Sequence, residues 1–265
     1  MQFKSNGVPV LSDEEIEAIA YQLLGEVDSS CLTLPSKVPI PSILQYLVDN
    51  HGLKFTISDE LGFRGLNKIR GKTILSQNTI ILDSEIVHND EPLFFMTAAH
   101  EIGHWRLHRH RKIFSDNEEE TIDSFEDGEF SFWDKDESKF ISKKKELITS
   151  IDWLEHHAKV FAASLLMPRV AFYEAVISVQ RNIDINRNLG KIYLNDNPSS
   201  KNDFSNTIKG LQEIFGLSKQ AIGIRIRELN LFIDNRYQCQ NKDKEKLRAF
   251  SLEQDRKMSF DYLDY

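Results

Sequence analysis

The sequence predicts a protein of the α+β class: a mainly helical domain with a small antiparallel sheet, followed by a helical, helix-turn-helix-like module. Three observations lead to this prediction. Apolar residues recur at helical spacing in several segments, the period changes to two between residues 53 and 82, and a Gly-Leu-Ser turn separates two helical segments near the C-terminus. We assign residues 1–170 to the first domain, 171–233 to the helical module and 234–265 to a tail.

Length and composition are those of an ordinary globular protein. The 265 residues are 40% hydrophobic and 28% charged, enough to bury a sizeable core. No apolar run approaches the roughly 18 residues of a membrane span, and the N-terminus lacks the features of a signal peptide. Only Cys31 and Cys239 are present, too few for a disulfide framework. We therefore expect a cytoplasmic protein that does not associate with membranes.

The first elements are expected to be helices that serve as scaffold. Ser12 is a suitable N-cap because three acidic residues follow it, and one apolar face then continues to about residue 27. After a proline-rich connection, a second amphipathic segment ends near Gly52.

Strands are expected next, because apolar and polar residues alternate from residue 53. The strand-like runs cover residues 53–57, 73–75 and 79–82. The separators are expected to be a turn at residues 76–78 and three glycines, Gly62, Gly65 and Gly71. The prediction is a small antiparallel sheet, one edge of which could bind an extended peptide by strand addition.

The strongest functional signal follows the strands. His100, Glu101 and His104 form the H-E-x-x-H pattern, on a predicted helix with Asp90 as N-cap and Pro92 in its first turn. Residues four apart on a helix project from the same side, so both imidazoles can bind one metal ion while the glutamate faces whatever else that ion binds. Two imidazoles suit zinc, and the carboxylate can act as a general base in hydrolysis.

A catalytic zinc ion usually has a third protein ligand. Glu155 is the favoured candidate, because it projects from a helical face of small and apolar residues, where an unpaired carboxylate is costly to bury. His156 and His157 compete for the role but lie about 100° and 200° further round the helix. His110 has the spacing of a longer zinc motif, but Leu107 replaces the glycine that lets the chain turn back.

Residues near the motif receive supporting roles. His108, one turn after His104, is expected to orient a ligand or cap the helix rather than bind the metal. His110 and Tyr173 are candidates for stabilising an oxyanion. The first functional hypothesis is therefore a zinc-dependent endopeptidase that uses Glu101 as general base.

Two segments of the chain resemble the signatures of the ImmA/IrrE family of metallopeptidases. The first is AAHEIGHWRLHRH, from Ala98, and the second is EHHAKVFAASLLMP, residues 155–168. The resemblance covers roughly residues 12–233 and implies a zincin-like metallopeptidase domain with Glu155 as a metal ligand. Lys159 departs from the family's asparagine. Because the family is known for cutting helix-turn-helix repressors, the resemblance also implies a substrate of that kind and derepression of its genes.

A long acidic insertion, about residues 111–150, separates the two signatures. Within it, residues 115–138 hold eleven acidic residues and one lysine, a local charge of −10 in a chain whose net charge is −8. The composition favours a disordered or loosely packed loop. The alternative is a lid or exosite, in which the negative charge steers the basic surface of a DNA-binding substrate.

The C-terminal third is expected to contain helices at residues 207–215 and 219–229. Lys219, Arg225 and Arg227 are the residues available for phosphate contact, although three basic residues beside Glu228 make a weak nucleic-acid footprint. We favour a packing or partner-recognition module. The alternative function is a DNA-binding regulator that uses the zinc domain as a sensor or structural unit.

Overall fold

The computed structural model describes residues 8–64, 66–110, 121–125, 149–195 and 197–235. The helices are α1 (Asp13–Asp28), α2 (Ile40–His51), α3 (Ser84–Asn89), α4 (Glu91–His108), α5 (Ser150–Leu166), α6 (Arg169–Asn182), α7 (Pro198–Phe215) and α8 (Lys219–Glu228), with 3-10 turns η1 (Ser29–Leu32) and η2 (Leu75–Gln77). The strands are β1 (Lys54–Ser58), β2 (Phe63–Arg64), β3 (Asn67–Ile74), β4 (Thr79–Asp83), β5 (Thr121–Phe125), β6 (Ile192–Leu194) and β7 (Phe232–Asp234).

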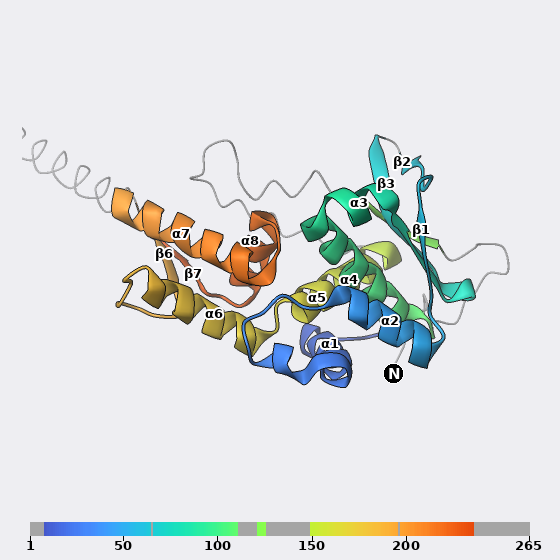
Figure 1. Ribbon diagram of the computed structural model, residues 1–265, viewed down its shortest axis with the longest axis horizontal. Helices are drawn as coiled ribbons and strands as arrows, with labels where there is room; N and C mark the ends of the chain where they lie inside the picture. Colours follow the sequence, from blue (N-terminus) through green and yellow to red (C-terminus); the bar gives the residue numbers. More distant parts are fainter. Residues whose placement is uncertain (1–7, 65, 111–120, 126–148, 196, 236–265) are drawn as a thin grey trace, which may run out of the picture.

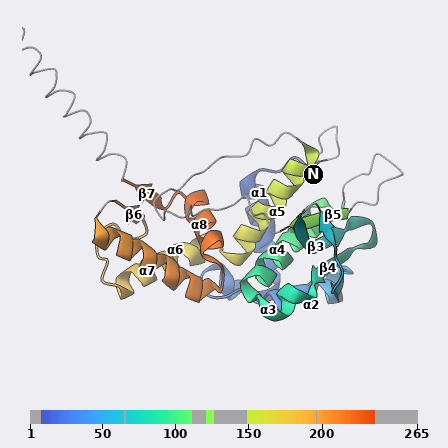
Figure 2. The same ribbon diagram turned by 90° about the horizontal axis from the view of Figure 1, so that it is seen from above.

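The helices and the sheet form two adjoining regions. The larger contains α1 to α5 with the main sheet, and the smaller contains α6, α7 and α8 around the short β6–β7 pair (Figures 1 and 2). One continuous cluster of buried apolar side chains runs through both regions. The structure therefore belongs to the α+β class and is mostly helical. Among the described residues, no single helix is both long and apolar enough to cross a membrane.

The main sheet is mixed, which corrects the predicted antiparallel sheet. Strands β2, β3, β4 and β5 pair antiparallel, but β1 pairs parallel with β4. The order is β1-β4-β3-β2, so β4 lies between β1 and β3. The parallel pair arises because β1 lies beside β4 and not beside the strand that follows it in the chain. Ile80 and Leu82 of the central strand β4 are fully buried.

The acidic insertion contributes a strand to this sheet. Residues 121–125 form β5, which pairs with β3 from Ile69 to Ile74. This part of the insertion is therefore not a loose loop. The edge of β3 that faces away from β4 is covered by the chain's own backbone. The insertion's other residues up to 148 lie outside the described part of the chain.

The sequence signals that begin and end helices are confirmed at the elements that build the first region. Ser12 and Glu15 form a capping box at the start of α1, and Asp90 accepts a hydrogen bond from the Leu93 amide at the start of α4. Gly52 ends α2 in the left-handed conformation (φ 70°), which glycine adopts without a steric cost. Local hydrogen bonding thus fixes where α4 begins.

The C-terminal helices pack against the first region rather than presenting a basic face. Arg225 of α8 is 3% exposed; its Nη2 atom donates to Glu17 of α1 at 2.9 Å and its Nε atom donates to the Met167 carbonyl at 2.9 Å. Arg225 is therefore not available for phosphate contact, contrary to the prediction. The helix pair itself is confirmed, with α7 starting earlier, at Pro198.

Candidate metal centre

Helix α4 places the two motif histidines on one face. His100 and His104 are one turn apart, and their Nε2 atoms lie 2.9 Å from each other. His104 is fully buried and His100 is 9% exposed, so both side chains lie inside the protein and not on its surface. Two imidazoles at this separation can bind the same ion.

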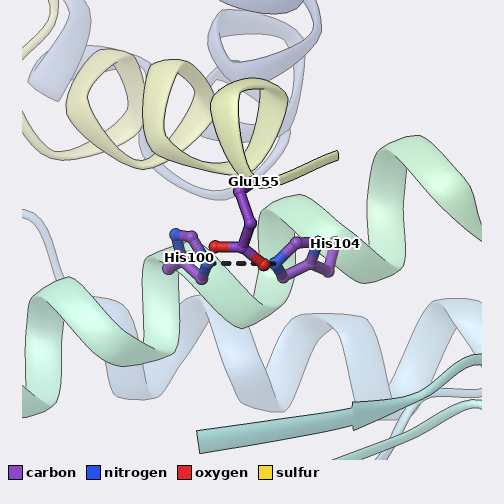
Figure 3. Close-up of side chains that lie close together, drawn as sticks. All are labelled: His100, His104 and Glu155. Carbon is purple, nitrogen blue, oxygen red and sulfur yellow. Dashed lines mark hydrogen bonds and ion pairs between the residues drawn. The ribbon is translucent and has the colours of Figure 1, made fainter. Parts of the chain in front are cut away.

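Helix α5 adds a carboxylate to this pair. Glu155 projects from α5 toward α4 (Figure 3), with one oxygen 3.2 Å from His104 Nε2 and the other 3.3 Å from His100 Nε2. One ligand atom of each residue lies within 4.8 Å of the other two. Within the described parts of the chain, His100, His104 and Glu155 are the group of histidine, cysteine and acidic side chains that could hold a metal ion.

The close approach of the two helices depends on small residues. Gly103 lies against α5, where an added Cβ atom would come within 3.1 Å of the Ala158 Cα atom. Ala158 and Ala162 are fully buried on the same face of α5 as Glu155. The face of small residues seen in the sequence therefore brings the backbone of α5 close enough for Glu155 to reach the histidines.

The protonation of Glu155 and His104 suits a cation. Burial raises the pKa of the Glu155 carboxyl, but hydrogen bonds from both imidazoles outweigh it and lower the pKa well below 4.5. Burial and the charge of His100 lower the pKa of His104 to about 4. Burial also lowers the pKa of His100, yet Glu155 outweighs it and raises the pKa above 6.5. At neutral pH Glu155 is ionised and His104 is neutral, the forms that bind metal, whereas His100, whose pKa is raised by Glu155, has to lose its proton when a metal ion binds.

Glu101 points toward the sheet and is fully buried. The Thr73 hydroxyl on β3 donates a short hydrogen bond to Glu101 Oε2. Gly71, two residues before Thr73, faces the same carboxylate. Gly71 lies inside β3 and does not separate strands as predicted, because the carboxylate needs the space that a side chain would fill. The sequence pattern around Thr73 and Gly71 does not predict their contact with Glu101, although an isolated glycine within a strand-like run is a signal for close approach.

Three further histidines lie nearby. His108 is fully buried, and its Nδ1 atom lies 3.3 Å from His104 Nδ1, which leaves His104 Nε2 directed at the centre. His157 packs beside His108, with ring centroids 5.7 Å apart. His156 points away and pairs with Asp13 at 2.9 Å. The structure thus brings Glu155, and neither neighbouring histidine, to the ligand group.

Two other predicted site residues lie outside the ligand group. His110 follows the end of α4, is exposed, and accepts a hydrogen bond from Arg109. Because α4 continues through Leu107, the chain does not turn back toward the histidines. The Tyr173 hydroxyl on α6 lies against Gly190, where an added Cβ atom would come within 2.5 Å of it. Among the described contacts of His110 and Tyr173, none is with His100, His104 or Glu155, so these contacts do not support an oxyanion-stabilising role for either residue.

Comparison with known protein families and with curated proteins gives no match to the chain.

Proposed function

We propose that the protein is a zinc-dependent endopeptidase with a zincin-like catalytic domain. The observation that carries the proposal is the contact of Glu155 with both imidazoles of the H-E-x-x-H helix. Two imidazoles and one carboxylate make up the ligand set of a common class of hydrolytic zinc sites. The ligands would be His100, His104 and Glu155, holding one ion per chain.

The spacing of the three donors fits zinc. Two ligands at about 2.0–2.1 Å from a tetrahedral ion lie about 3.3 Å from each other. The separations here are 2.9 Å between the imidazole nitrogens and 3.2 and 3.3 Å between imidazole and carboxylate. Three protein ligands also leave a tetrahedral ion one open position, which catalysis requires and a structural site lacks.

Glu101 is the proposed general base. When bound, zinc would lower the pKa of a coordinated water toward about 7 and polarise a substrate carbonyl. Glu101 lies next to His100 on α4 and is shielded from bulk water by β3. Its carboxylate would take a proton from the attacking water and pass it to the leaving amine.

The proposed substrate is a helix-turn-helix repressor, and cleavage would relieve repression of its genes. This part of the proposal is supported by the resemblance of both signatures to the ImmA/IrrE family, and we expect it to take place in the cytoplasm. The acidic segment 115–138 agrees with a substrate that carries a basic, DNA-binding surface.

The test is cleavage of a repressor by the intact chain. The chain is co-expressed with a small repressor encoded beside its gene, and fragments are identified by mass. His104→Ala should lose both zinc and cleavage, because it removes a ligand. His88→Ala is the matched control: His88 lies on α3, and the hydrogen bond of its ring within the described residues is to the Ser84 carbonyl. Cleavage by His104→Ala at the wild-type rate would refute the proposal.

A further inference from the structure

We propose that Thr73 is a positioning residue for Glu101, and that Gly71 provides the space in which the Glu101 carboxylate is held. This inference rests on the proposed function, because it assigns β3 a part in orienting the general base. It concerns two residues outside both sequence signatures.

The Thr73 hydroxyl is placed to fix one carboxylate oxygen. It donates to Glu101 Oε2 and also lies 3.3 Å from the Glu101 carbonyl oxygen. Thr73 and Glu101 are both fully buried, so water does not compete for this hydrogen bond. Threonine is β-branched, so its χ1 angle and hence the position of its hydroxyl oxygen are restricted.

Gly71 is placed to admit the other carboxylate oxygen. A Cβ atom at this position would lie 2.6 Å from Glu101 Oε1, 2.7 Å from Thr97 Cγ2 and 3.0 Å from Glu101 Cγ. Residues two apart on a strand face the same side, so Gly71 and Thr73 both face α4. The pairing of β3 with β5 also shifts register between Ile69 and Gly71. A strand glycine at such an irregularity is typical of close backbone approach.

The backbone that carries these two residues is held from both sides. Gly71 and Thr73 pair with Leu82 and Ile80 of β4, and with Ser124 and Ile122 of β5. The position of the threonine hydroxyl is therefore set by the sheet and not by α4 itself. With Oε2 held by Thr73, the direction of Oε1 is also fixed, because the two oxygens belong to one planar group. The sheet thus determines where the general base points.

Thr73→Val is the main test, because it removes the hydroxyl and keeps the shape. Thr73→Ser keeps the hydroxyl and loses only a methyl group. We expect Thr73→Val to lower kcat on the repressor about 10- to 100-fold, the range seen when groups that orient active-site ligands are removed. KM and zinc affinity should change much less than kcat, because the Thr73 hydroxyl contacts Glu101 and not a proposed metal ligand. Thr73→Ser should keep a kcat close to that of the wild type. Gly71→Ala should lower kcat while zinc still binds.

Controls separate positioning from folding and from failure of the proposed function. Thermal unfolding of Thr73→Val, Glu101→Gln and the double variant measures the coupling of the two side chains without any activity; we expect non-additive shifts in Tm. Three results, each with an active wild type, would overturn the positioning role. They are an unchanged kcat in Thr73→Val, additive Tm shifts, and a Thr73→Ser variant as impaired as Thr73→Val. A wild-type chain that cleaves no repressor would instead refute the proposed function and the positioning role with it.

Discussion

Replacing Gly103 by alanine should weaken metal binding without unfolding the protein. Gly103 lies between the two histidines of α4, at the contact with α5. The substitution adds one methyl group and removes none of the three proposed ligands. It therefore tests whether the close approach of α5 is what delivers Glu155 to the centre.

The size of the effect follows from the distances at this contact. The new Cβ atom would lie 3.1 Å from Ala158 Cα and 3.2 Å from the Ala158 carbonyl oxygen. Carbon atoms in contact prefer about 3.5–4.0 Å, so α5 has to move by about 0.5 Å. These two neighbours are backbone atoms, so no rotamer change relieves them, and the Phe161 side chain also comes within 3.1 Å, through its Cδ1 atom. Because ligand distances in metal sites hold to within about 0.2 Å, this shift should lower zinc affinity at least about ten-fold.

Stability should change much less than affinity. Overpacking costs about 1–3 kcal/mol, but alanine is better than glycine in a helix by about 1 kcal/mol, so we expect a net loss of about 1 kcal/mol. Zinc affinity is measured by competition with a chromophoric chelator, and stability by urea unfolding of the metal-free chain. Gly25→Ala in α1 is the matched control: its nearest neighbour, Leu32 Cδ1, would lie at 3.8 Å, an ordinary contact. If Gly103→Ala binds zinc as tightly as Gly25→Ala, the packing argument is wrong.

Four other perturbations have defined outcomes. Arg225→Met should cost about 3 kcal/mol in urea unfolding, because it removes a buried charge that pairs with Glu17 and the Nε donor to the Met167 carbonyl oxygen. Lys201→Met on the exposed face of α7 should cost almost nothing. Burial raises the pKa of Glu17, but hydrogen bonds from Arg169, Tyr21 and Arg225 outweigh it and lower the pKa below 4.5. The contribution of ionised Glu17 to folding stability is therefore present above that pH and is lost on acidification. Glu17→Gln should flatten the fall in Tm below about pH 4.5. His108→Phe should weaken zinc binding about ten-fold or more in the chelator assay, by releasing His104. Neutralising the acidic residues of 115–120 and 126–138, with β5 intact, should lower kcat/KM on the whole repressor about ten-fold and change kcat/KM little on a short peptide. It should also flatten the salt dependence of kcat/KM on the repressor. An equal loss on both substrates would refute electrostatic steering of the repressor by this segment.

Local signals in the sequence predicted the helices and the ligand group. The caps at Ser12 and Asp90 act within one turn of the chain, so they can be read without knowledge of the fold. Glu155 was predicted because its helical face consists of small and apolar residues, a pattern that itself describes the packing against α4. The cluster of His100, His104 and Glu155, which could hold a metal ion, was predictable because both of its elements are helices, on which sequence spacing determines the direction of a side chain.

Contacts between distant segments could not be predicted in the same way. The parallel pairing of β1 with β4 depends on which strand becomes central, and that depends on the whole core. Arg225 looks exposed in a helix-turn-helix pattern, but its partner Glu17 lies 208 residues away in the chain. Thr73 and Gly71 of strand β3 contact Glu101 of helix α4. Neither the spacing nor the composition of these two segments indicates that they lie side by side.

The most direct test of the account compares the wild-type chain with Glu101→Gln in the same preparation. Zinc content is measured by native mass spectrometry, and repressor fragments are measured by intact mass on the same samples. We expect one zinc ion per chain in both proteins and cleavage by the wild type alone, because the proposed role of Glu101 is to move protons and not to hold the metal. Cleavage by Glu101→Gln at the wild-type rate, with zinc bound, would contradict it.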